Sequence, residues 1–166
     1  MPVRDILHYP DARLKTVCDT LSDPLLARRV IDDLIDTLDA GPPRTVGIAA
    51  PQIGDLVRIV IVDTARNPKF PGGHGLLKLI NPRILSHEGE QVFREGCLSL
   101  PDYTANIRRY EHVVVAALDA DMNDVEICAS GFESVVLQHE IDHLDGTLFL
   151  DRVVDIKTDL FQRKRK

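Results

Sequence analysis

The stretch Gln138-His139-Glu140-Ile141-Asp142-His143-Leu144 contains the pattern HExxH. On a helix, residues i and i+4 project from one face, so His139 and His143 can bind one metal ion together. Glu140 lies beside them and can serve as a general base toward water. Apolar residues flank the pattern in a helical rhythm, at Val135, Val136, Ile141 and Leu144. Two histidines can also fall four residues apart by chance, so the pattern needs support from the rest of the chain.

A catalytic metal ion needs a third protein ligand and an open coordination position. The chain has three cysteines, Cys18, Cys97 and Cys128. Cys97 lies in Glu95-Gly96-Cys97-Leu98-Ser99, where the adjacent glycine lets a thiolate and backbone amides approach a ligand closely. A lone cysteine is more often a small buried apolar residue than a ligand, and we expect Cys18 and Cys128 to be buried in that way.

Two of these motifs, at 95–99 and 138–144, resemble signature motifs of the peptide deformylase family. The third signature of that family is a Gly-x-Gly-x-Ala-Ala-x-Gln loop. This chain has Thr45-Val46-Gly47-Ile48-Ala49-Ala50-Pro51-Gln52 at the corresponding place. The motifs occur in the family's order and at its usual separations, and the resemblance extends from about Leu7 to Arg152.

The chain departs from the family pattern at Thr45, where the family has the first glycine of the loop. A β-branched residue is strained at this position if the backbone needs a positive φ, and well suited to it if the backbone is extended. We expect Thr45 to reshape the rim of the substrate cleft and to leave the metal site unchanged.

The resemblance implies a metal-dependent hydrolase that removes the N-formyl group from N-formylmethionine of newly made polypeptides and releases formate. Cys97, His139 and His143 would be the metal ligands, and Glu140 would move the protons. By position in the motifs, the Gln52 amide and the Leu98 backbone N–H would stabilise the oxyanion. Backbone groups at three further positions would hold the peptide as an added strand, namely Val46, Gly47 and Gly96.

The donor set leaves the metal open, because one thiolate and two imidazoles suit zinc, ferrous iron, cobalt or nickel. The family resemblance favours ferrous iron. Ligating histidines usually donate their other ring nitrogen to a nearby acceptor, and Glu95 and Asp142 are the candidates for that role.

Two other functions are compatible with parts of the pattern. An HExxH metallopeptidase would usually complete its site with a downstream histidine or glutamate, and neither residue type occurs after His143. A non-catalytic deformylase-like peptide-binding protein would be signalled by loss of Cys97, Glu140 or a histidine, and all are present.

Composition places further bounds on the chain. With 166 residues, 44% of them apolar and 28% charged, we expect a single catalytic domain over 1–166, with 155–166 as a basic C-terminal tail. No apolar run approaches the ~20 residues of a membrane span. Met1–Asp5 lacks the features of a signal peptide, and an odd number of widely spaced cysteines does not indicate a disulfide framework. These features predict a cytoplasmic protein.

Charge is distributed unevenly. The formal net charge is −6, while Lys157–Lys166 carries five basic groups and one acidic group, about +4, which leaves the remaining body near −10. An acidic body argues against general nucleic-acid binding. The basic residues Arg163–Lys166 are either a solvated end or a site of transient contact with ribosomal phosphate.

Hydrophobic periodicity predicts the elements. A helix is expected over Pro24–Ala40, capped by Asp23, and a second helix carrying the metal pattern over 131–144. Strands are expected at 46–50, 56–63, 76–85, 91–94, 105–109, 112–118 and 125–129. Pro82 is expected to interrupt the strand at 76–85, and the last two strands are expected to pair as a hairpin. A loop is expected at 67–75. The expected fold is therefore α+β, a single domain with antiparallel β-sheets around a buried metal-binding HExxH helix.

Overall fold

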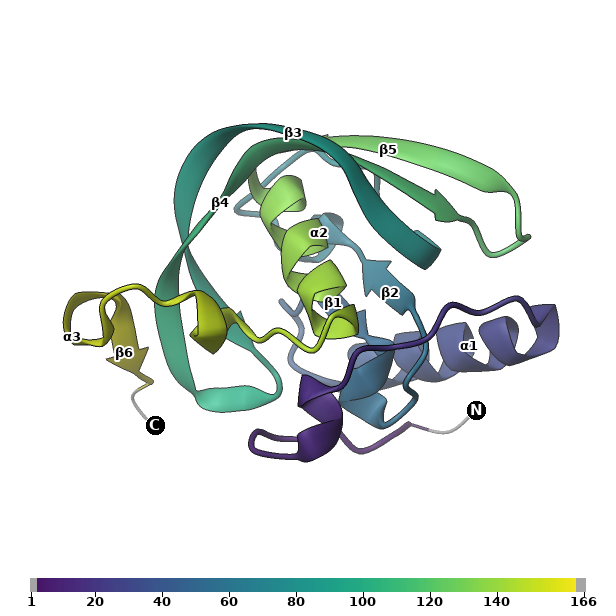
Figure 1. The fold of residues 1–166 in the computed structure, drawn as a ribbon, viewed down its shortest axis with the longest axis horizontal. Helices are drawn as coiled ribbons and strands as arrows, with labels where there is room; N and C mark the ends of the chain where they lie inside the picture. The colour runs from purple at the N-terminus through teal and green to yellow at the C-terminus, as the bar shows by residue number, and fades with distance from the viewer. Residues whose placement is uncertain (1–2, 164–166) are drawn as a thin grey trace.

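The structure, a computed structural model, describes residues 3–163 (Figure 1). Its helices are α1 (Pro24–Ala40), α2 (Gly131–Leu144) and the short α3 (Ile156–Asp159), with 3-10 turns η1 (Ala12–Lys15), η2 (Ala50–Ile53), η3 (Thr64–Arg66) and η4 (Phe149–Arg152). Its strands are β1 (Gly47–Ala49), β2 (Ile59–Val62), β3 (Leu77–Cys97), β4 (Leu100–Leu118), β5 (Asp124–Ser130) and β6 (Leu160–Gln162).

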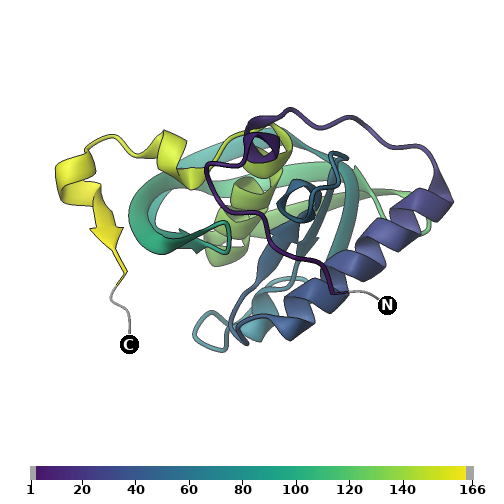
Figure 2. The same ribbon diagram turned by 90° about the horizontal axis from the view of Figure 1, so that it is seen from below.

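Within the described residues the strands form one six-stranded antiparallel sheet in the order β1-β2-β3-β4-β5, with β6 paired to the first part of β4. The long strands β3 and β4 form a hairpin that curves around α2, while α1 lies below it on the far side of β1 and β2 (Figures 1 and 2). The tip of this hairpin pairs Cys97 with Leu100. The α+β class expected from the sequence, with antiparallel strands around the helix of the HExxH pattern, is confirmed.

Helix α1 is amphipathic and well capped. The Asp23 carboxylate accepts hydrogen bonds from the amides of Leu25 and Leu26, and Pro24 occupies the first helical position. Its apolar face packs on β1, β2 and η2, in a cluster that includes Val30, Leu34, Leu38, Ile48, Ile59 and Ile61. The helix bounds predicted from periodicity are confirmed.

Helix α2 is buried on every side, since each residue from Glu133 to Leu144 is buried. A helix that is enclosed all round must satisfy its polar residues inside the protein. Its apolar residues pack into a second cluster with β2, β4 and β5, including Val60, Val115, Ile127, Leu137 and Ile141. The predicted bounds of this helix are also confirmed.

The segments expected as separate strands at 76–85 and 91–94 are parts of one strand, β3. Pro82 does not end this strand. The register with β4 shifts between the pairs Ile80–Leu118 and Arg83–Ala116, so proline, which has no N–H to donate, lies at an irregularity of the strand pairing. Asn81 there has a φ of 51° and binds the backbone of Leu21 through its side-chain amide.

Two expectations are corrected. Cys128 is exposed, because successive side chains of a strand face opposite sides, and on β5 the residues Ile127 and Ala129 face the core. Cys18 is buried as expected. The segment 155–166 is not a plain tail as far as the structure describes it, since it forms α3 and then β6, which pairs Thr104 with Phe161. Residues 164–166 lie outside the described residues.

Within 3–163, no helix combines the length and the apolar character that crossing a membrane requires.

Helix α1 offers a matched test of this packing. Leu34 is fully buried and Leu25 on the same helix is 79% exposed. Leu34→Ala should lower the free energy of unfolding by about 2–5 kcal/mol, and Leu25→Ala should change it by no more than about 0.5 kcal/mol. Urea titration followed by circular dichroism measures both. Equal destabilisation by the two variants would contradict the described burial of α1.

Candidate metal centre

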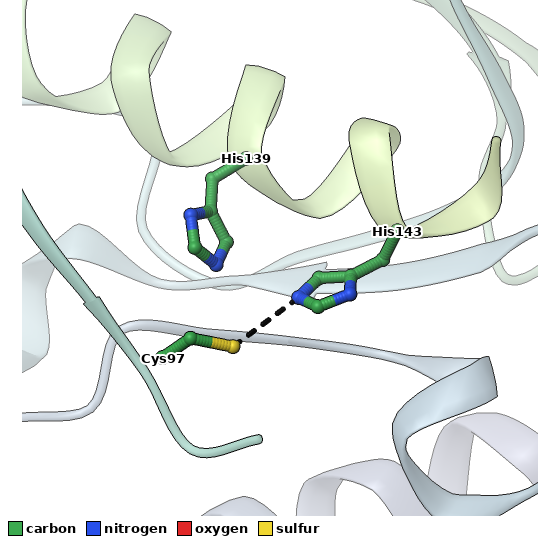
Figure 3. A group of neighbouring side chains, drawn as sticks. All are labelled: Cys97, His139 and His143. Atoms are coloured by element: carbon green, nitrogen blue, oxygen red, sulfur yellow. Dashed lines mark hydrogen bonds between the residues drawn. The ribbon is translucent and has the colours of Figure 1, made fainter. Parts of the chain in front are cut away.

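Two secondary-structure elements bring three donor side chains together (Figure 3). Helix α2 projects His139 and His143 from one face, and β3 ends at Cys97 beside them. The Cys97 Sγ lies 3.4 Å from Nε2 of His143, and one ligand atom from each of the three residues lies within 4.8 Å of the others. This is the set predicted from the sequence.

The chemistry of these donors fits a divalent ion. Nδ1 of His139 lies 2.8 Å from Oε1 of Glu95, and because a carboxylate accepts hydrogen bonds, Nδ1 carries a proton. Nε2 is therefore the nitrogen that would bind a metal, on giving up the proton that it carries in the charged ring. Burial and the positive charges of His139 and Arg109 hold the pKa of His143 well below its ordinary value, so its ring is neutral, the form that binds metals.

A buried ionic network supports the histidine. Arg109 donates to both oxygens of Glu95 at 2.8 Å and to Asp142 at 2.6 Å, and Arg152 also donates to Asp142. Burial opposes ionisation of Glu95, but the hydrogen bonds from Arg109 and His139 outweigh it and lower its pKa to about 2. Glu95 thus contacts a histidine as expected, whereas Asp142 contacts two arginines.

Glu140 lies beside the cluster with a free carboxylate oxygen. Its Oε1 is buried and has no hydrogen-bond partner within residues 3–163. Burial, opposed by the positive charge of His139, raises the pKa of Glu140 to about 7. A Cβ added at Gly47 would lie 2.6 Å from Oε2 of Glu140, so the glycine of the loop motif is what allows the carboxylate to approach β1.

Gln52 is held in a fixed orientation and is almost fully buried. Its Oε1 accepts from the Ala49 amide at 2.9 Å. Its Nε2 lies 3.1 Å from the Ser99 hydroxyl and 3.5 Å from the Cys97 Sγ. The amide hydrogens therefore point toward the cluster, because the backbone N–H determines which end is the oxygen.

A cleft of about 490 Å³ opens onto the cluster. Most of the residues selected from the sequence line it, namely Val46, Gly47, Gln52, Gly96, Cys97, Leu98 and His139. Thr45 lies at its rim and is not among the positive-φ residues of the described chain, so its backbone carries no left-handed strain.

Comparison with known proteins identifies the family. The chain matches the model of the polypeptide deformylase family over residues 3–159. It is 41% identical to the peptide deformylase of Thermodesulfovibrio yellowstonii, covering 100% of this chain and 98% of the relative. It is 42% identical to peptide deformylase 2 of Vibrio cholerae, covering 100% and 95%. The chain belongs to the peptide deformylase family.

Solved structures agree with this assignment. A peptide deformylase from Legionella pneumophila superposes with a TM-score of 0.83 at 38% identity, covering 94% of this chain and 89% of that one. The Ehrlichia chaffeensis peptide deformylase in complex with actinonin has a TM-score of 0.85 at 33% identity, covering 95% and 92%. Family and fold thus make this chain an enzyme with deformylase function, and no comparison favours the peptidase or the non-catalytic alternative.

Several residues of this deformylase site were not selected from the sequence. Arg109 was missed, although it shares the inward-facing parity of Ala105 and Ile107 on β4, and that parity was a usable signal. An aromatic wall was missed too, in which Phe70 and Phe132 stack with ring centroids 4.1 Å apart and Phe93 packs beside them. No local pattern connects these three rings, because they come from three separate segments.

The contact between Glu95 and His139 can be tested through metal affinity. Glu95→Gln weakens the acceptor for Nδ1 of His139, and changes of this kind typically cost about 10- to 100-fold in metal affinity. Glu90→Gln, on the exposed part of the same strand, is the matched control and should leave the affinity unchanged. Competition titration with a zinc chelator measures both, and equal affinities for the two variants would contradict the role assigned to Glu95.

Proposed function

We propose that Cys97, His139 and His143 hold one divalent ion with which this enzyme removes the N-formyl group from the N-terminal methionine of newly made polypeptides. The observation that carries the proposal is the convergence of these three donors behind a cleft that Cys97 and His139 line, next to Glu140, whose buried Oε1 has no hydrogen-bond partner within residues 3–163. When bound, such an ion lowers the pKa of water and polarises a carbonyl oxygen.

Glu140 is the proton carrier in this proposal. Its pKa of about 7 suits a group that must both accept and return a proton near neutral pH. It takes a proton from the attacking water, whose oxygen bonds to the formyl carbon. It then gives a proton to the methionine nitrogen as the carbon–nitrogen bond breaks. The products are formate and a free amino terminus.

Gln52 and Leu98 stabilise the developing oxyanion. The Gln52 amide already points toward the Cys97 Sγ, and Leu98 follows Cys97 directly at the tip of the hairpin. Donors fixed before the reaction need no reorganisation, and the loss of one typically costs about 100- to 1000-fold.

One part of the cleft suits the methionine side chain of the substrate, and another suits its peptide backbone. Phe93 and Phe132, with Val135 of α2, give an apolar wall suited to the methionine side chain. Backbone groups of Val46 and Gly47 on one side, and of Gly96 on the other, can pair with an extended peptide. Backbone pairing does not depend on side chains, which allows varied sequences after the methionine.

We favour ferrous iron as the ion, with zinc, nickel or cobalt compatible with the same donors. A cytoplasmic location is proposed with it, because Cys18, Cys97 and Cys128 are all free and a thiolate ligand needs reducing conditions.

Glu140→Gln and Cys97→Ala separate the two roles. The protein is purified without oxygen, its bound metal is measured, and formate release is followed with a formyl-Met-Ala-Ser peptide. Glu140→Gln should retain the ion and lose about 100- to 10,000-fold in kcat, because only proton transfer is removed. Cys97→Ala should lose both the ion and the activity. Wild-type turnover by Glu140→Gln, or a wild-type protein without bound metal, would refute the proposal.

The basic C-terminus gives one further proposal, a transient contact with the ribosome. Arg163 lines the cleft, so the contact would rest on Lys164–Lys166, outside the described residues. A chain ending at Arg163 should bind ribosomes more weakly than the full chain at low salt, and the difference should vanish at high salt. Co-sedimentation measures this, and equal binding of both chains at low salt would contradict the proposal.

A further inference from the structure

Among the described residues, three arginines line the cleft: Arg44, Arg94 and Arg163. They come from separate parts of the chain, before β1, near the end of β3 and directly after β6. Their shared position is therefore a product of the fold and not of a local basic run.

Arg163 is brought to the cleft by strand pairing. Strand β6 pairs with β4, and the Arg163 amide then donates to the backbone oxygen of Asp102 at 2.7 Å. A Cβ built on Gly96 would lie 2.5 Å from Nη2 of Arg163. The guanidinium thus lies directly on the glycine that precedes Cys97, beside the backbone proposed to hold the peptide.

Arg94 is fixed by the same strand. Its guanidinium stacks over the ring of Phe161 at 3.4 Å, and its Nε donates to the Thr104 hydroxyl at 3.0 Å. These contacts orient the guanidinium without neutralising its charge. Arg94 and β6 therefore hold each other in place at this side of the cleft.

Over residues 3–163, none of the three arginines forms an ion pair with a carboxylate, although the chain has an excess of acidic groups. Elsewhere arginines such as Arg58 and Arg66 lie against aspartates. Within the described chain, Glu95 is the acidic residue that lines the cleft, and both its oxygens are already bound by Arg109. The cleft mouth is thus positive on an acidic protein.

From this geometry we propose that Arg44, Arg94 and Arg163 bind acidic side chains in the residues directly after the formylmethionine. The inference rests on the proposed function, since it concerns the part of the peptide that leaves the metal centre along Gly96. The enzyme then processes chains with early aspartate or glutamate faster than chains with early lysine or arginine, because a positive rim attracts the former and repels the latter.

Three peptides with amidated C-termini test the inference: formyl-Met-Ala-Asp-Asp-Ser, formyl-Met-Ala-Ser-Ser-Ser and formyl-Met-Ala-Lys-Lys-Ser. Amidation removes the terminal carboxylate, so only side chains can supply the negative charge. At low ionic strength, kcat/KM for the acidic peptide should exceed that for the basic one by roughly 10-fold or more. The ratio should approach one in about 1 M salt, where screening acts within ~3 Å.

Single variants assign the effect to the rim. Arg44→Gln and Arg163→Gln should each lower the acidic-to-basic ratio by roughly two- to fivefold, the range of an exposed ion pair. Arg163→Lys keeps the charge and should keep most of the ratio. Arg28→Gln is the matched control, because it removes one positive charge from the exposed face of α1, outside the cleft, and should leave the ratio unchanged.

The outcomes separate this inference from the proposed function. Cleavage of all three peptides with equal kcat/KM would overturn the inference and leave the deformylase proposal standing. A ratio lowered as much by Arg28→Gln as by Arg163→Gln would also overturn it, since the whole-chain charge would then be the cause. Failure to release formate from any of the three peptides would overturn both.

Discussion

The complete burial of α2 is the constraint on which the rest of the structure depends. This helix carries charged and polar residues into the centre of the sheet, where an unpaired charge is costly. Arg109 of β4 compensates two of the buried charges, because its guanidinium donates hydrogen bonds to both Glu95 and Asp142. The same network fixes the ring of His139, so the interactions that neutralise the charges of the buried helix also orient a proposed metal ligand.

The hairpin of β3 and β4 adds the second half of the site. Cys97 lies 46 residues before His143, and only the curvature of the hairpin around α2 brings its sulfur to the histidines. A second close contact lies between α2 and β1, where the absence of a side chain at Gly47 leaves space for the Glu140 carboxylate. The Glu140 carboxylate is therefore enclosed against the backbone of β1 beside the proposed metal ligands, and this burial raises its pKa against the opposing charge of His139.

The sequence predicts well whatever depends on local spacing. The bounds of α1 and α2 follow from periodicity and from the cap at Asp23. The three donor side chains that the structure brings together were selected from HExxH and the motif around Cys97. The sequence predicts poorly which distant strands pair and which face of a strand points to the core. Pairing of β6 with β4 places Arg163 in the cleft, and no local pattern at the basic C-terminus indicates it. Cys128 was assigned to the wrong face because its strand was identified without its phase.

The net charge of the chain does not predict the charge of its cleft. The net charge of −6 describes the whole surface, but charges farther away than about 8 Å are largely screened at physiological salt. A substrate in the cleft experiences the groups within that distance, which include Arg44, Arg94 and Arg163 at the mouth. The excess of acidic residues argues against nucleic-acid binding over the surface as a whole, and it is consistent with a cleft of the opposite sign. A fold can thus place a basic cleft mouth on an acidic protein when strand pairing gathers a few distant residues.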